Sequence, residues 1–146
     1  MFGFLKKMNK AGAAISEKAV KSENKDLMEA MVGAAALIGY ADGSLDDSEI
    51  SAIDGLLKNS KALQVFGNEP AQEFDRLCQV LSAGYRMGRL EVMKEISDCK
   101  GNKDEAEMVL VMAIEVAYAD GDCDDKETKE LEAIAGKLGL RLSDYM

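Results

Sequence analysis

The sequence predicts an all-helical domain of about seven helices, in which two helix–loop–helix units are related by an internal repeat. Apolar residues make up 47% of the 146 residues, which is enough for one core, and they recur at helical spacing. A single proline and few runs of β-branched residues also favour helices over strands. We therefore expect a single domain over residues 1–146.

Residues 1–21 predict a basic amphipathic helix with an apolar stripe and flanking lysines. The stripe contains Phe4, Leu5, Met8, Ala11, Ile15 and Ala19, and the lysines off it are Lys6, Lys7, Lys10 and Lys21. Such a helix either docks on an anionic membrane surface or an acidic partner, or folds back on the acidic body of its own domain. The stripe has only a few large apolar residues, which favours folding back.

The first helix–loop–helix unit spans residues 25–58. Its first helix is expected over residues 26–40, and Gly43 suits the left-handed turn that follows a helix end. Residues 46–49, Asp-Asp-Ser-Glu, have the form of a capping box. The second helix of the unit therefore begins just after the acidic loop.

Residues 59–101 connect the two units. Pro70 suits the first turn of a helix that continues through residues 74–85. Gly84 and Gly88 suggest a break before a shorter helix.

The second unit spans residues 103–138. Residues 108–117 are apolar apart from Glu115, and this run is shorter than the roughly 20 residues that cross a bilayer. It predicts the most buried helix of a bundle. The helix after the second acidic loop is expected to end at Gly139.

The two acidic loops repeat one another. Residues 40–49 (YADGSLDDSE) and 118–127 (YADGDCDDKE) are identical at seven of ten positions, 78 residues apart. Both match the back half of an EF-hand calcium loop, which has oxygen ligands at positions 5, 7, 9 and 12 and glycine at position 6. Positions 1 and 3 carry no carboxylate in either loop. A full ligand set therefore requires both loops, apposed about a pseudo-twofold axis as in paired EF-hands.

Six acids are the candidate metal ligands. They are Asp42, Asp46 and Glu49 in the first loop and Asp120, Asp124 and Glu127 in the second. All of these donors are oxygens, which indicates a hard divalent cation, with calcium favoured over magnesium. The alternative is that the loops only end one helix and cap the next. Capping alone does not explain Asp42 and Asp120, since crowded acids repel one another unless a cation is present.

The composition argues against several function classes. The net charge of −9 disfavours nucleic acid, and no glycine-rich phosphate-binding motif indicates a nucleotide. The chain has no histidine, so Ser-His-Asp triads and Cys-His dyads are excluded. Three cysteines without a C-x-x-C motif suggest neither a zinc site nor a disulfide framework, as in a reducing cytoplasm. Residues 1–25 carry six lysines against two glutamates, a net of +4, which leaves −13 on the rest.

The chain resembles the tellurite-resistance protein TerB family over nearly its whole length. The resemblance is carried by the repeated Y-A-D-G-x-x-D-D-x-E, the basic amphipathic start, the acidic helical body and the total length. It implies an all-helical fold of about seven helices, a metal-binding role for the same six acids, and a part in a bacterial stress response that confers tellurite resistance. It also implies an association with the inner face of the membrane through an integral partner, TerC. The loops differ at Ser44 and Asp122, so we expect the two halves to differ in affinity.

We therefore expect a cytoplasmic, non-enzymatic module, peripheral at the inner membrane, that binds a divalent cation and docks to membrane-associated partners. The alternative is a metal-free structural adaptor whose acidic loops bind a basic protein partner. An enzyme that uses paired carboxylates on tellurite or another oxyanion is least favoured, because an acidic surface repels an oxyanion.

Overall fold

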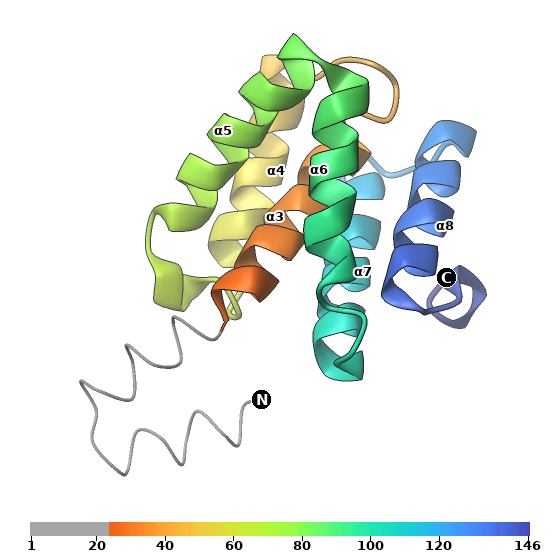
Figure 1. The fold of residues 1–146 in the computed structure, drawn as a ribbon. Coiled ribbons are helices and arrows are strands. Elements are labelled where there is room, and N and C mark those ends of the chain that lie inside the picture. The colour runs from red at the N-terminus through yellow and green to blue at the C-terminus, as the bar shows by residue number, and fades with distance from the viewer. Residues whose placement is uncertain (1–23) are drawn as a thin grey trace, which may run out of the picture.

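The structure is a computed structural model that describes residues 24–146. These residues form six α-helices and two short 3₁₀ turns, and they contain no β-strand (Figure 1). The elements are α3 (Lys25–Gly39), α4 (Asp47–Asn59), η1 (Gln64–Phe66), α5 (Glu69–Ala83), α6 (Tyr85–Ser97), α7 (Lys103–Ala117), α8 (Asp125–Leu138) and η2 (Leu142–Asp144). The prediction of an all-helical fold is confirmed. The helix predicted over residues 1–21, which completes the expected set of seven, lies outside the described residues.

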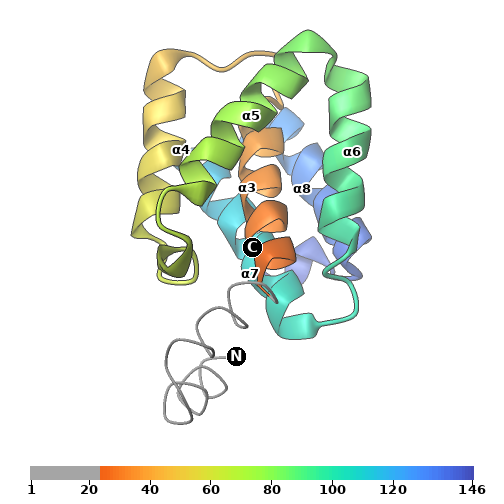
Figure 2. The ribbon, with the colours of Figure 1, turned by 60° about the vertical axis from the view of Figure 1, so that its left-hand side comes forward.

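Helix α3 is the centre of the fold and packs against each of the other five helices, which surround it in Figure 2. Its buried residues are Leu27, Met28, Ala30, Met31, Val32, Gly33, Ala34, Ala35, Ala36, Leu37 and Ile38. Many of them are small, which lets neighbouring helices approach closely. A Cβ added to Gly33 would lie 2.7 Å from Cγ1 of Val92 in α6, so a larger residue here would force Val92 to shift.

The prediction that residues 108–117 form the most buried helix is wrong. They belong to α7, in which Val111 is 43% exposed and Glu115 is also exposed. Helix α3 is the most buried instead, because neighbours pack against it on all sides. A run of apolar residues does not reveal how many helices surround it.

Proline and glycine set the ends of several helices. Pro70 lies in the first turn of α5 and Gly139 ends α8 with a φ of 73°, as predicted. Gly84 alone separates α5 from α6, so the predicted break there is confirmed. The prediction that the helix before the break continues to residue 85 is wrong, since α6 begins at that residue. The second predicted break is wrong, since Gly88 lies within α6. A Cβ at Gly88 would lie 3.0 Å from Cγ1 of Val80, so this glycine lets α6 pack closely on α5.

Candidate functional site

The loop after α3 is a tight turn at Gly43. This glycine has a φ of 100°, and a Cβ added to it would meet no atom within 4 Å. Glycine is therefore favoured here because the backbone is in the left-handed conformation, and not because a side chain would lack space. The backbone N–H of Ser44 donates to Oδ1 of Asp42 at 3.2 Å. Asp42 thus closes the turn, a local role that the sequence interpretation did not anticipate.

A capping box begins α4, as predicted. The backbone N–H of Glu49 donates to Oδ1 of Asp46 at 2.8 Å, and the backbone N–H of Asp46 donates to Oε1 of Glu49 at 3.3 Å. The hydroxyl of Ser48 also donates to Oδ1 of Asp46 at 2.9 Å. These bonds satisfy backbone groups at the start of the helix and fix the direction in which both carboxylates point.

The loop between α7 and α8 has the same geometry. Gly121 has a φ of 103°, and the backbone N–H of Asp122 donates to Oδ1 of Asp120 at 3.3 Å. The backbone N–H of Glu127 donates to Oδ1 of Asp124 at 2.7 Å, and the backbone N–H of Asp124 donates to Oε1 of Glu127 at 3.1 Å. In both loops, therefore, the first acid closes the turn and the later acids lie at the start of the helix that follows.

The two loops line one cavity of about 210 Å³. Five of the six candidate ligands are among its lining residues, namely Asp42, Glu49, Asp120, Asp124 and Glu127. The sixth, Asp46, is not among them. Apolar side chains, including Ile38, Ile53 and Val116, form the rest of the wall, and no lysine or arginine of residues 24–146 lines it. The fold thus brings acids from both loops to one place without a basic side chain to balance them.

The carboxylates of this cavity act on one another across the two loops. Burial is the largest cause that raises the pKa of Glu127, and the negative charges of Asp124, Asp120 and Asp42 raise it further. Burial likewise raises the pKa of Glu49, to which the charge of Asp42 also contributes. Asp42 therefore repels a glutamate of its own loop and one of the other loop. A cation between the loops would relieve this repulsion.

A family model described as tellurite resistance protein TerB matches residues 28–146. The chain belongs to the TerB family. No curated protein and no solved structure matches it. The matched region includes both acidic loops, and the resemblance inferred from their repeated motif is confirmed. None of the helices within residues 24–146 has the length and apolar character needed to span a bilayer.

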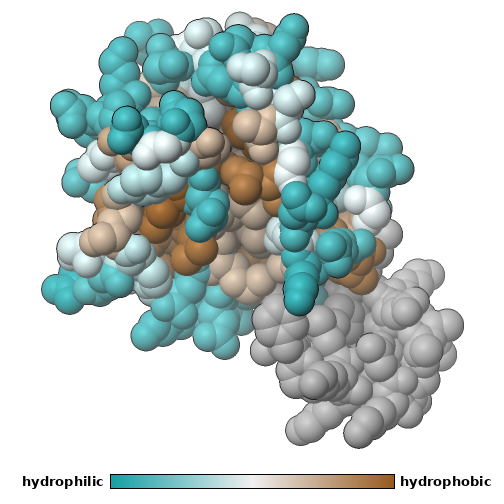
Figure 3. All heavy atoms as spheres, turned by 180° about the vertical axis from the view of Figure 1, so that it is seen from behind, coloured by the Kyte–Doolittle hydropathy of each residue, from teal (hydrophilic) through white to brown (hydrophobic). Residues whose placement is uncertain are grey.

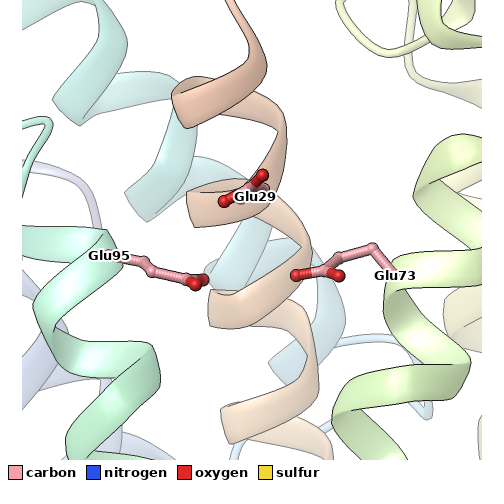
Figure 4. Close-up of side chains that lie close together, drawn as sticks. All are labelled: Glu29, Glu73 and Glu95. Carbon is pink, nitrogen blue, oxygen red and sulfur yellow. The ribbon is translucent and has the colours of Figure 1, made fainter.

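This TerB domain also contains a second group of carboxylates, which the sequence interpretation missed. Glu29 of α3, Glu73 of α5 and Glu95 of α6 point toward one another (Figure 4), with one carboxylate oxygen from each within 4.8 Å of the others. Within the described part of the chain, no other three acidic or cysteine side chains meet at this spacing. The available signal was Glu29 itself, which is the one charged residue within residues 27–38.

Glu95 is the most strongly perturbed member of this group. Burial, followed by the charges of Glu29 and Glu73, raises the pKa of Glu95 to about 7. Its Oε2 is buried and has no hydrogen-bond partner in the described structure. Arg76 partly neutralises the group, since its guanidinium donates to both oxygens of Glu73 at 2.8 and 2.9 Å. The group therefore exchanges a proton near neutral pH, and it has a counter-ion that the loop cavity lacks.

Proposed function

We propose that this TerB domain is a non-enzymatic module that binds a divalent cation, calcium above all, between its two acidic loops. The observation that carries the proposal is that five carboxylates from loops 78 residues apart line one cavity. Oxygen donors are the ligands that calcium and magnesium prefer. Calcium accepts about six to eight oxygens in irregular geometry, which suits a site assembled from two half-loops better than the strict octahedron of magnesium does.

The bonds that hold the loops leave oxygens available for a cation. Backbone N–H groups bind one oxygen of each cavity carboxylate, namely Oδ1 of Asp42, Asp120 and Asp124 and Oε1 of Glu49 and Glu127. The second oxygen of each carboxylate makes no hydrogen bond within the described chain. Asp46 does not line the cavity, and we infer that it supports the site by capping α4. Each half of the internal repeat then contributes one turn, one cap and part of the ligand set.

In this proposal the module serves tellurite resistance as a peripheral protein at the inner face of the membrane, docked to a membrane-associated partner of the TerC kind. Membership of the TerB family supports the role in tellurite resistance. The charge asymmetry of the chain, with a basic start and an acidic remainder, supports contacts with a charged surface or partner.

A metal-free adaptor is the second candidate function, in which the acidic loops bind a basic protein partner. The observation that favours it is that both loops are closed by their own turns and capping boxes. The loops therefore have hydrogen bonds that hold their shape without a cation, and their exposed acids remain available to a partner.

Calorimetric titration of the full chain with calcium, and then with magnesium, distinguishes the two functions. The variant Asp42→Asn with Asp120→Asn removes one carboxylate from each loop, while asparagine still accepts the bond that closes the turn. The matched control is Asp47→Asn with Asp125→Asn, which makes the same charge change at exposed positions that do not line the cavity.

We expect calcium to bind the wild type and the control and to raise their melting temperatures. At a hundredfold excess over Kd, bound calcium adds about 2.7 kcal/mol to the free energy of unfolding. The cavity variant should show neither effect. A wild type that gives no heat and no change in melting temperature with millimolar calcium would contradict cation binding and leave the adaptor. Tellurite resistance restored to a deficient strain by the control but not by the cavity variant would link the site to the cellular role.

A further inference from the structure

An apolar groove runs between α4 and α7, on residues separate from the loop cavity, and has a volume of about 620 Å³. Its apolar lining consists of Met31, Leu56, Ala62, Met108, Val111 and Met112. Figure 3 views the molecule from the side of α4 and α7, where hydrophobic surface is visible between hydrophilic borders. Val111 is 43% exposed, so α4 and α7 do not close over it.

Three acids of α7 line the same groove: Asp104, Glu107 and Glu115. They lie on one face of α7 with Val111, because these positions recur three or four residues apart. Asp104 and Glu115 form no ion pair within residues 24–146, and Glu107 accepts a hydrogen bond from the neutral hydroxyl of Tyr145. No lysine or arginine of the described chain lines the groove. The groove is therefore apolar and bordered by uncompensated negative charge.

The chain preceding α3 joins the fold near one end of this groove. Met31 lines the groove and lies about 9 Å along the helix axis from the start of α3 at Lys25. The first turn of α7 is also close to this point, since burial and the charge of Asp26 raise the pKa of Glu105. The point at which residues 1–23 join the described chain therefore lies near one end of the groove.

We propose that residues 4–20 dock in this groove as an amphipathic helix of the same chain. The stripe that includes Leu5, Met8 and Ile15 covers the apolar lining, and the flanking lysines face the acids of α7. A helix over residues 4–20 is about 26 Å long, close to the 22 Å or so of α7, so it fits lengthwise. This inference goes beyond cation binding and does not depend on it.

Methionine methyl NMR on the full chain tests the proposal, because natural probes lie on both sides of the contact. Met8 belongs to the segment, Met108 and Met112 line the groove, and Met87 is 74% exposed on α6. We expect NOE cross-peaks from the ε-methyl of Met8 to that of Met108 or Met112, with none to Met87. Their intensity should be independent of protein concentration, and molar salt should weaken them because it screens the lysine–carboxylate attraction.

Two matched pairs of variants locate the contact. Ile15→Glu places a charge on the apolar stripe, whereas Ala13→Glu places the same charge on the opposite side of the predicted helix. Val111→Glu places a charge in the groove, whereas Met87→Glu does so at an exposed apolar site on α6. The first member of each pair should abolish the Met8 cross-peaks, and the second should retain them.

The buried Met93 reports whether each variant keeps its fold. A wild type without the Met8 cross-peaks, or cross-peaks that survive both Ile15→Glu and Val111→Glu, would overturn the proposal. So would cross-peaks that disappear on dilution, which would assign the groove to a second copy of the chain. A different result is that the chemical shift of the Met8 ε-methyl changes from that of an undocked segment only when anionic vesicles are added. That result would assign the segment to the membrane and also overturn docking in the groove.

Discussion

Replacement of Glu95 by glutamine is expected to stabilise the domain at pH 8 and to have little effect at pH 5. Glutamine resembles the protonated carboxyl group, which the folded state favours because burial and the charges of Glu29 and Glu73 raise the pKa of Glu95 from 4.5 to about 7. A group whose pKa is raised on folding contributes stability that is fully present below its unfolded pKa. That contribution is lost as the pH rises from about 4.5 through about 7.

The size of the effect follows from the same shift. At about 1.4 kcal/mol per pKa unit, the change from 4.5 to about 7 sets an upper limit of about 3.4 kcal/mol. Glu95 is only partly buried, so solvent screening reduces the expected gain to about 1–2 kcal/mol. For a domain of this size, that gain raises the melting temperature by about 3–6 °C.

Urea and thermal unfolding of the wild type and the variant at pH 5 and pH 8 measure this difference. Glu132→Gln is the matched control, because Glu132 is exposed on α8 and lies outside the carboxylate group. The control should change stability little at either pH. Equal stabilisation by Glu95→Gln at both pH values, or a gain in the control as large as that in the variant, would refute the assignment of a raised pKa to Glu95.

Three further predictions concern two glycines, the loop glutamates and Glu130, the one buried charged residue within residues 24–146. Gly43→Ala should cost about 1–2 kcal/mol in urea unfolding, since Gly43 has a φ of 100°. Gly55→Ala, in open space within α4, should instead stabilise by about 0.5–1 kcal/mol. Glu49→Gln, with the same change in the second loop, should preserve apo stability because glutamine closes the capping box. Its calcium affinity by calorimetry should fall, and unchanged affinity would argue against ligation. Arg89→Ala should cost about 3 kcal/mol, because it removes the ion pair from Glu130, which is 7% exposed. A further Glu130→Gln change should recover part of that loss, and no recovery would contradict the ion-pair explanation.

The sequence by itself determined the two acidic loops and those helix ends that local caps and turns set. Capping bonds and turns join residues only two or three positions apart, so adjacent residues encode them. Asp46, Asp124 and Gly139 therefore end or begin helices where their neighbours predict. The duplicated motif also led to the TerB family, because a repeat of seven identical positions is visible without any structure.

Only the tertiary structure decided which residues meet across helices. It placed α3 rather than α7 at the centre, brought Glu29, Glu73 and Glu95 together, and left Asp46 out of the cavity that the other five loop acids line. Helical periodicity assigns a residue to a face of its own helix. The neighbour that covers that face depends on how all six described helices pack, which no local pattern contains.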